Sequence, residues 1–149
     1  MASKPEVQVL SPFQKEDCKS VVSALQQEKY IVMDCEGVHL SSTGPITLMQ
    51  IGTIKGNIYL FDVMKNEKEQ DKNFFKDTGL EDILTSSQIV KVIHSCSNDS
   101  AALFHQFGIK LHNVFDTQVA YLEIEEDKGR KLSCRLKLTE LCPAYSDRT

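Results

Sequence analysis

The sequence predicts an α/β domain built on a mixed β-sheet flanked by helices, and two observations support this. Early in the chain, three strand-like apolar segments follow one another in the order of an antiparallel meander, at residues 29–34, 46–51 and 58–62. Later, a strand, a helix and a second strand follow at the spacing of a parallel crossover unit, at residues 89–93, 97–107 and 113–116. A meander that continues into parallel strands gives a mixed sheet.

Length and composition set the scale of this domain. The chain has 149 residues, and 41% of them are hydrophobic, which is enough for one core. We expect one domain over residues 7–149, with residues 1–6 as a flexible N-terminus. The formal net charge of −4 gives no reason to expect nucleic acid. A nucleic-acid-binding domain of this composition has to hold phosphates through local basic patches or bound cations.

The N-terminal elements have recognisable boundaries. Val7–Leu10 is strand-like. A helix is predicted to start directly after it, with Ser11 as the N-cap, Pro12 in the first helical position and Gln14 completing a capping box. Apolar residues at helical spacing then carry this helix to about Glu28.

The remaining elements follow from turn and cap residues. Lys55-Gly56-Asn57 predicts a tight turn between the last two meander strands. Residues 64–78 alternate Lys and Glu and are predicted to form a solvated loop, followed by a short helix at Leu80–Thr85. Gly108 is a typical C-terminal residue for the crossover helix. Asp116 is placed to cap one more helix that starts beside it.

The cysteines and the N-terminus indicate an intracellular protein. The five cysteines include no Cys-x-x-Cys pair, so reduced thiols fit better than a disulfide framework. A zinc site from His94, Cys96, Cys134 and Cys142 is conceivable, but its spacings match no finger or ribbon. The chain begins without the apolar run of a signal peptide, and no stretch approaches the about 18 apolar residues of a membrane helix. No membrane partner is expected.

The strongest chemical signal is Asp34-Cys35-Glu36-Gly37 at the end of an apolar strand. Residues i and i+2 of a strand point to the same face, so both carboxylates project together. Such a pair repels itself unless a cation neutralises it, and Mg²⁺ and Mn²⁺ take oxygen ligands. Gly37 would leave room for a substrate backbone. Taken alone, however, such a pair is more often two solvated acids than a metal site.

Asp99 is the second acidic candidate. It lies just after a predicted buried strand, in the first turn of the crossover helix. Taken alone, it is best explained as an acid that interacts favourably with the helix N-terminus. In open α/β sheets, however, ligands gather outside the carboxyl ends of parallel strands. We therefore expect Asp34, Glu36 and Asp99 to converge there.

A series of segments, taken together, resembles a known family. Their order is similar to that in the DEDD superfamily of 3′–5′ exonucleases of the ribonuclease D type, which have a ribonuclease H-like fold. The similarity is greatest to the branch of Egalitarian and exonuclease 3′–5′ domain-containing protein 1, and it covers about residues 7–141. The segments that carry it are residues 34–37, 46–52, 61–63, 91–94, 98–99, 107–109 and 113–118.

The resemblance implies a mechanism and assigns roles. Members of this family hydrolyse phosphodiester bonds with two divalent ions, Mg²⁺ or Mn²⁺. Asp34 would bridge both ions, Glu36 would hold the first and orient the attacking water, and Asp99 would serve the second through water. Leu40 falls where related enzymes wedge a side chain against the terminal base, although simple packing is the commoner role of such a leucine.

The family pattern also contains a motif that this chain does not match. It closes the site with Tyr-x-x-x-Asp on a late helix, and no such motif follows Asp99. Tyr145-Ser-Asp147 has the wrong spacing, while Tyr30 and Asp34 have the right spacing but lie on a strand. We therefore expect the fourth carboxylate and the C-terminal part of the domain to be missing from these 149 residues, which leaves enzymatic activity of the chain open.

Two functions fit these features best, and a plain interaction domain that binds no nucleic acid is a third possibility. The first is an exonuclease acting on single-stranded nucleic acid, with RNA as the expected substrate. The second is a catalytically inactive adaptor of the same fold that binds RNA or other proteins. In either case we expect the protein to act inside the cell, in the cytoplasm or the nucleus. A basic stretch with Lys128, Arg130 and Lys131 could contact phosphates in either case, although a solvated loop is the commoner role of such a stretch.

Overall fold

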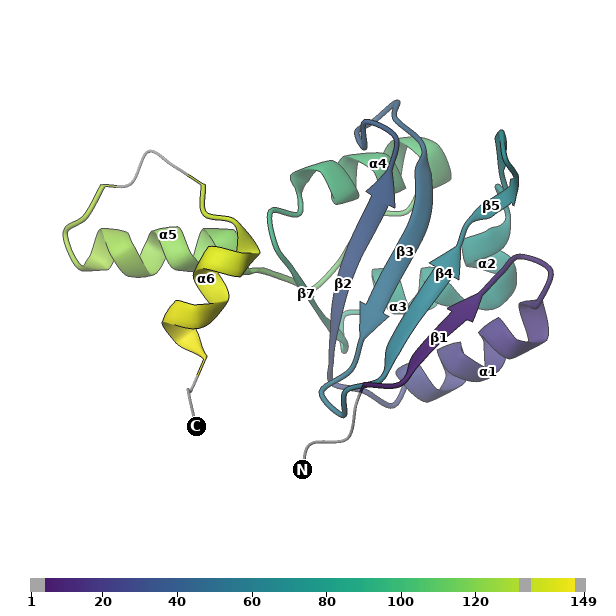
Figure 1. The fold of residues 1–149 in the computed structure, drawn as a ribbon, viewed down its shortest axis with the longest axis horizontal. Coiled ribbons are helices and arrows are strands. Elements are labelled where there is room, and N and C mark those ends of the chain that lie inside the picture. The colour runs from purple at the N-terminus through teal and green to yellow at the C-terminus, as the bar shows by residue number, and fades with distance from the viewer. Residues whose placement is uncertain (1–4, 132–134, 147–149) are drawn as a thin grey trace.

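The structure, a computed structural model, describes residues 5–131 and 135–146. Its centre is a six-stranded mixed sheet with the order β1-β4-β3-β2-β7-β8 (Figure 1). Strand β2 is antiparallel to β3, and β3 to β4, while β7 and β8 continue the sheet in parallel. The predicted fold class is therefore confirmed. The strands are β1 Val7–Leu10, β2 Tyr30–Gly37, β3 Ile46–Gly52, β4 Ile58–Asp62, β7 Val90–Ile93 and β8 Val114–Asp116.

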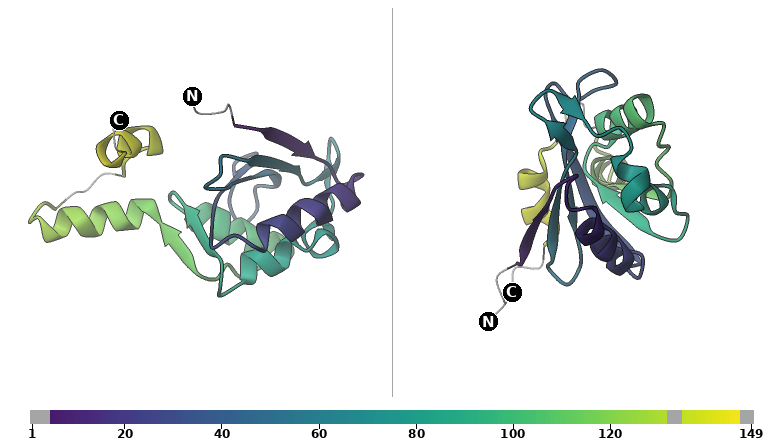
Figure 2. Two further views of the ribbon diagram at one scale, coloured as in Figure 1. Left: turned by 90° about the horizontal axis from the view of Figure 1, so that it is seen from below. Right: turned by 90° about the vertical axis from the view of Figure 1, so that its right-hand side faces the viewer.

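The helices divide between two places. Helices α1 to α4 cover one face of the sheet, whereas α5 runs away from the β8 edge and α6 lies on the side of the open face, beyond that edge (Figures 1 and 2). The open face of the sheet therefore presents the outward side chains of β2. The helices are α1 Lys15–Leu25, α2 Phe74–Thr78, α3 Leu80–Thr85, α4 Ser97–Phe107, α5 Thr117–Asp127 and α6 Leu138–Tyr145.

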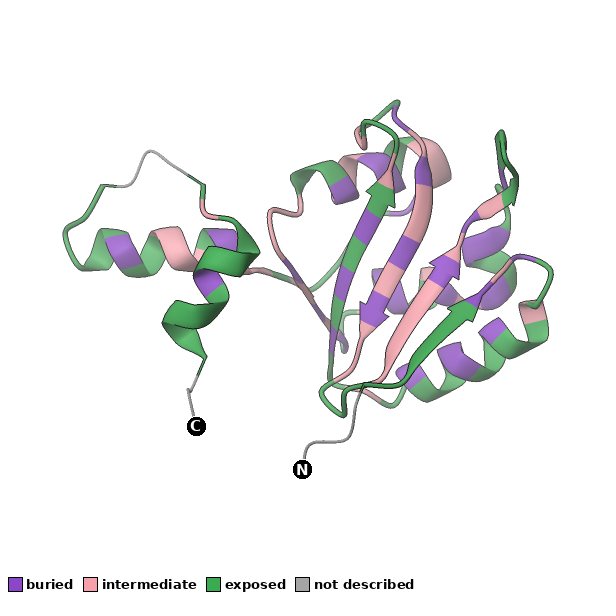
Figure 3. Cartoon of the chain, viewed as in Figure 1, coloured by how far each residue is buried: buried purple, intermediate pink, exposed green. Residues whose placement is uncertain are grey.

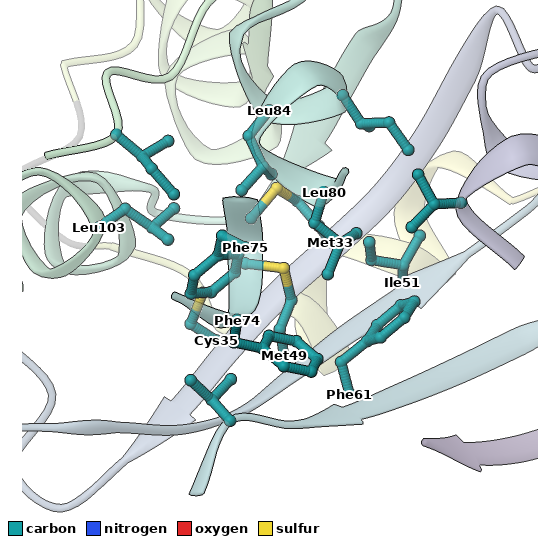
Figure 4. Close-up of a cluster of buried hydrophobic side chains, with 14 of the residues drawn as sticks. Met33, Cys35, Met49, Ile51, Phe61, Phe74, Phe75, Leu80, Leu84 and Leu103 are labelled. Atoms are coloured by element: carbon teal, nitrogen blue, oxygen red, sulfur yellow. The ribbon is translucent and has the colours of Figure 1, made fainter. Parts of the chain in front are cut away.

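The core lies between the sheet and helices α1 to α4. In β2, Ile31, Met33 and Cys35 are buried, and the residues between them are exposed on the open face (Figure 3). Met33 and Cys35 point into a cluster that also contains Phe74 and Phe75 (Figure 4). This strict alternation places Asp34 and Glu36 on the open face, as expected for residues i and i+2 of a strand.

The prediction of a solvated loop over residues 64–78 is wrong. The segment forms a small hairpin of β5 Met64–Asn66 and β6 Glu69–Gln70, followed by α2. Phe74 and Phe75 are fully buried, and their rings meet edge to face with centroids 5.7 Å apart. Two adjacent aromatic residues therefore outweigh the charged residues around them, because burying them in the core contributes more than solvating their neighbours.

The first helix also begins later than predicted. Residue Gln14, and not Ser11, is the N-cap, and α1 ends at Leu25 instead of near Glu28. The side-chain oxygen of Gln14 does accept the backbone amide of Ser11 over 3.3 Å. The backbone amide of Gln14, however, donates to the Ser11 carbonyl and closes a separate turn. The capping-box residues are thus used to shape the turn before the helix.

Within the described part of the chain, no helix is long and apolar enough to cross a membrane. The expected flexible N-terminus at residues 1–6 falls mostly outside the described residues, which start at residue 5.

Candidate metal and nucleic-acid site

Asp34 and Glu36 project from the end of β2 onto the open face of the sheet. In the ladder with β3, Asp34 pairs with Gln50 and Glu36 pairs with Leu48. The side-chain amide of Gln50 donates to Glu36 Oε1 over 3.3 Å. The two acids therefore share one face, and a neutral donor from the adjacent strand orients the second of them.

Asp99 reaches the same strand from helix α4. Its carboxylate is buried, with 4% exposure, and accepts a hydrogen bond of 2.8 Å from the backbone amide of Cys35. The reason lies in the sheet, since β2 pairs with β7 only as far as Val32. Beyond that point β7 turns away into α4, and Asp99 meets the amide of β2 that has lost its strand neighbour. The structure thus brings Asp99 to the backbone between Asp34 and Glu36.

The charges of these acids disfavour one another. Burial, followed by the charges of Asp99 and Glu36, raises the pKa of Asp34 to about 6. Burial also raises the pKa of Asp99, and the hydrogen bonds from Cys35 oppose this effect without cancelling it. A site in which carboxylates hold their protons unusually tightly is one that a cation would stabilise.

The donor set fits a hard divalent ion, although it does not form a complete cage. Carboxylate oxygens are the donors that Mg²⁺ and Mn²⁺ prefer. Among residues 5–131 and 135–146, no three or more His, Cys, Asp or Glu side chains are arranged to hold a metal ion by themselves. Water or phosphate oxygens would therefore have to complete the coordination, as is usual for Mg²⁺.

The repulsion among Asp34, Glu36 and Asp99 should make the free energy of unfolding of the metal-free chain depend on pH. Because the folded-state pKa of Asp34 lies above its ordinary value of 3.8, the folded state holds the proton more tightly than the unfolded state. The stability that the folded state gains from protonated Asp34 is therefore lost as the pH rises from about 4 to about 6. Since Asp34 is partly solvated, we expect about 1 kcal/mol. Denaturant unfolding of the metal-free chain and of Asp34→Asn across this range measures it.

Mn²⁺ provides the control for that experiment. Above pH 6, added Mn²⁺ should raise the melting temperature of the original chain, and Asp34→Asn should lose most of this increase. An equal Mn²⁺-induced increase in both proteins would show that the ion binds elsewhere.

Asp116 caps helix α5, as predicted, and does more. Its carboxylate accepts the amide of Gln118 at 2.9 Å and also the amides of Ser95 and Cys96 at 3.0 and 2.8 Å. Ser95 has a positive φ of 57°, which is unusual for a residue with a side chain. Asp116 therefore stabilises the sharp turn that leads from β7 into α4, and so helps to set the position of Asp99.

Replacing Asp116 should weaken the fold measurably. Burial alone would raise the pKa of Asp116, but the amides of Cys96, Ser95 and Gln118 hold it below its ordinary value. Its stabilisation is therefore present at neutral pH and is lost as the pH falls through that lowered pKa. We expect Asp116→Ala to lower the free energy of unfolding by about 2 kcal/mol. The exposed residue Asp127 at the end of α5 offers a matched control, and Asp127→Ala should change it by less than about 0.5 kcal/mol.

His94 has a structural partner on each ring nitrogen. Nδ1 lies 2.8 Å from the Thr117 hydroxyl, and Nε2 lies 2.7 Å from the carbonyl oxygen of Leu136. Since a carbonyl only accepts, Nε2 carries the proton, and neither nitrogen is free to bind zinc. Cys134, which the conceivable zinc site also needs, lies outside the described residues. His94 instead joins β7, α5 and the segment before α6, a role with no signal in the sequence.

The structure gives Gly37 a different role from the predicted one. A Cβ atom at this position would lie 2.1 Å from the carbonyl oxygen of Pro45, and 3.2 Å from Leu40 Cδ1. The protein's own β2–β3 loop, residues 38–45, fills the space that was predicted to admit a substrate backbone. Leu40 is partly buried and packs against the core, so packing accounts for at least part of its role.

Side chains of the basic stretch form ion pairs with an acid of the preceding helix, α5. Lys128 and Arg130 both pair with the buried carboxylate of Glu125, at 3.1 and 2.9 Å. They lie at the end of α5 that points away from the sheet, far from β2 (Figure 1). Lys131 is exposed in the same region. These three residues are therefore not brought together with the acids, and their binding of nucleic acid stays a prediction.

A hollow adjoins Asp34 on the open face. It has a volume of about 230 Å³ and its walls come from β2, β7 and the starts of α5 and α6. Val32 and Val92 form an apolar side, while Asp34, His94 and Thr117 provide polar groups.

Asp147 of the Tyr145-Ser-Asp147 sequence lies outside the described residues.

A meander that continues into parallel strands, with acids at the end of its first strand, is the arrangement of a ribonuclease H-like domain. The family model described as 3′–5′ exonuclease matches residues 10–149. The chain therefore belongs to the 3′–5′ exonuclease family.

Curated relatives support the same branch of the family. Over 112 residues the chain is 34% identical to the human piRNA biogenesis protein EXD1, a match that covers 75% of this chain and 20% of that protein. Over 107 residues it is 30% identical to the Egalitarian protein homolog of Caenorhabditis elegans, covering 70% of this chain and 18% of that protein. The chain thus spans about a fifth of the length of these relatives.

Solved structures show the same fold. The ribonuclease D of Trypanosoma brucei in complex with RNA U12 is 28% identical, with a TM-score of 0.70, over 82% of this chain and 41% of that chain. The GMP complex of the same enzyme reaches a TM-score of 0.77 at 24% identity, over 95% of this chain and 42% of that chain. The EXD2 exonuclease domain soaked in Mn and GMP has a TM-score of 0.58 at 20% identity, over 91% of this chain and 66% of that chain.

Proposed function

We propose that this protein is a metal-dependent 3′–5′ exonuclease that acts on single-stranded RNA, with its site on the open face at the end of β2. The observation that carries the proposal is the hydrogen bond from the Cys35 amide to Asp99, which brings a third acid to the strand that bears Asp34 and Glu36. Membership of the exonuclease family supports the reaction. The RNA complex of the T. brucei ribonuclease D supports the choice of substrate class.

Each of these residues would have its own role in phosphodiester hydrolysis. Asp34, Glu36 and Asp99 would hold two divalent ions, which would supply an activated water and stabilise the departing 3′ oxygen. Gln50 keeps Glu36 oriented, and Asp116 keeps the turn before α4 in place. Leu40, on the loop that follows β2, would meet the terminal nucleotide. A fourth acid, which the family pattern supplies from a later helix, would complete the coordination.

The test is an end-labelled single-stranded RNA incubated with the chain and Mn²⁺, beside a DNA of the same sequence. With a 5′ label, an exonuclease of this polarity gives a ladder of progressively shorter products. Because three acids leave the coordination incomplete, we expect slow shortening by these 149 residues alone. RNA that is bound but never shortened, even after a helix with Tyr-x-x-x-Asp is appended, would favour the inactive adaptor instead.

A further inference from the structure

The β2–β3 loop, residues 38–45, is held by one side chain from another element. Gln106 near the end of α4 uses all of its hydrogen-bonding groups. Its Nε2 donates to the carbonyl oxygens of Ser41 and Gly44 at 3.0 and 2.7 Å. Its Oε1 accepts the backbone amide of Ile46 at 3.0 Å and the side-chain amide of Gln70 at 2.8 Å. A single amide thus connects the middle of the loop, and its junction with β3, to α4.

The neighbours of Gln106 fix its orientation. Lys72 donates to Gln70 Oε1 over 2.6 Å, so the Nε2 atom of Gln70 must face the other way. That nitrogen donates to the Ile46 carbonyl at 2.8 Å as well as to Gln106. The amide of Gln106 therefore has only one orientation that satisfies every partner. A network in which each group is satisfied is rigid and specifies one conformation.

Gln106 and Asp99 lie seven residues apart on α4, which places them two turns apart on one face of the helix. Asp99 binds the backbone of β2 between the two exposed acids, and Gln106 binds the loop that follows the second acid. Helix α4 therefore fixes the position of both the acidic end of β2 and the β2–β3 loop beside it. Leu40 lies in that loop and packs against the core, so its position depends on the loop conformation.

We infer that Gln106 is a positioning residue, which holds the β2–β3 loop so that Leu40 can meet the 3′-terminal nucleotide of a single-stranded RNA. The inference rests on the proposed function. Gln106 touches neither the acids nor the substrate, and it acts through the loop alone. Its loss should therefore weaken the binding of the RNA end and leave the binding of metal ions at Asp34 unchanged.

Two variants and one control test the inference. Gln106→Leu removes all four hydrogen bonds, whereas Gln106→Glu keeps the two accepting interactions and loses the two donations to the loop. Gln27→Leu makes the same change at an exposed glutamine after α1. Three quantities are measured for each full chain: hydrogen exchange of residues 38–46, the Kd for a short single-stranded RNA in Ca²⁺, and Mn²⁺ binding by calorimetry.

We expect faster exchange of residues 38–46 in Gln106→Leu, with exchange in β2 and α4 unchanged. The Kd for RNA should rise on the order of 10-fold in both variants, because small displacements of positioning groups have large effects. Mn²⁺ binding should not change. A loop that exchanges faster while the RNA affinity stays the same would overturn the inference. Equal exchange in the variant and the original chain would do so as well.

The outcomes also separate this inference from the proposed function. If the original chain binds RNA without shortening it and Gln106→Leu weakens that binding, the exonuclease proposal fails while Gln106 keeps its role. If the original chain shortens RNA and Gln106→Leu binds RNA equally well, the exonuclease proposal stands and the role of Gln106 is refuted. A misfolded Gln106→Leu would leave Gln106→Glu to decide between these cases.

Discussion

Asp34→Asn should reduce Mn²⁺-dependent shortening of RNA by at least about 10²-fold, which would bring it to background for a slow enzyme. The substitution keeps the size and a hydrogen-bonding oxygen but removes the charge that would hold the ions. Because the charges of Asp99 and Glu36 already disfavour a third negative charge here, the metal-free variant should fold at least as stably as the original chain. Activity would thus be lost without loss of structure. The measurement is the rate of product formation from 5′-labelled RNA with protein in excess.

A matched substitution controls for general effects of removing a charge. Asp17 is exposed on α1, on the helix-covered side of the sheet, and Asp17→Asn should shorten RNA at the original rate. Activity retained in Asp34→Asn would place the reaction at another site or in a contaminating nuclease. Activity lost in both variants would point to an effect of net charge on RNA binding.

Phe75→Ala should destabilise the chain by about 3–5 kcal/mol. The ring of Phe75 is 2% exposed and meets the rings of Phe74 and Phe107 edge to face, with centroids 5.7 and 4.7 Å away. Its removal leaves a cavity at the centre of the core under β2 and β3, where surrounding side chains cannot all move to fill it. For a domain of this size such a loss is a large fraction of the free energy of unfolding. Denaturant unfolding followed by circular dichroism measures the change.

Phe13 provides the comparison for that measurement. Its side chain is 79% exposed in the turn before α1, so Phe13→Ala makes the same chemical change without opening a cavity. We expect a change below about 0.5 kcal/mol. If the two variants were equally stable, α2 would not belong to the core.

Periodicity and motif order predict most of the sheet and the identity of its acids. Apolar and β-branched residues are concentrated in Ile46–Gly52 and Ile58–Asp62, as is typical of strands, and even the residues on the open face are half-buried there. The position of Asp99 could be expected from its place after a parallel strand. The hydrogen bond to the Cys35 amide could not, because it depends on where β7 leaves β2.

Other features have no local signal at all. Phe74 and Phe75 lie in a charged segment, and only the tertiary fold shows that the core reaches them. Gln106 resembles any surface glutamine of an amphipathic helix, and its four partners come from segments 36 to 65 residues away in sequence. Interactions at such separations are set by the packing of whole elements, which a window along the chain does not contain.

The order of the strands along the chain has a consequence for how this protein folds. Strands β2, β3 and β4 are consecutive and can pair through local contacts, whereas Asp99 meets Cys35 across 64 residues of sequence. Local pairing forms early and distant contacts form late. Asp34 and Glu36 repel each other as soon as β2 forms, but the charge of Asp99 is added only when β7 and α4 dock onto the finished meander. Divalent cations should speed this last docking step and leave the collapse of the meander at its original rate.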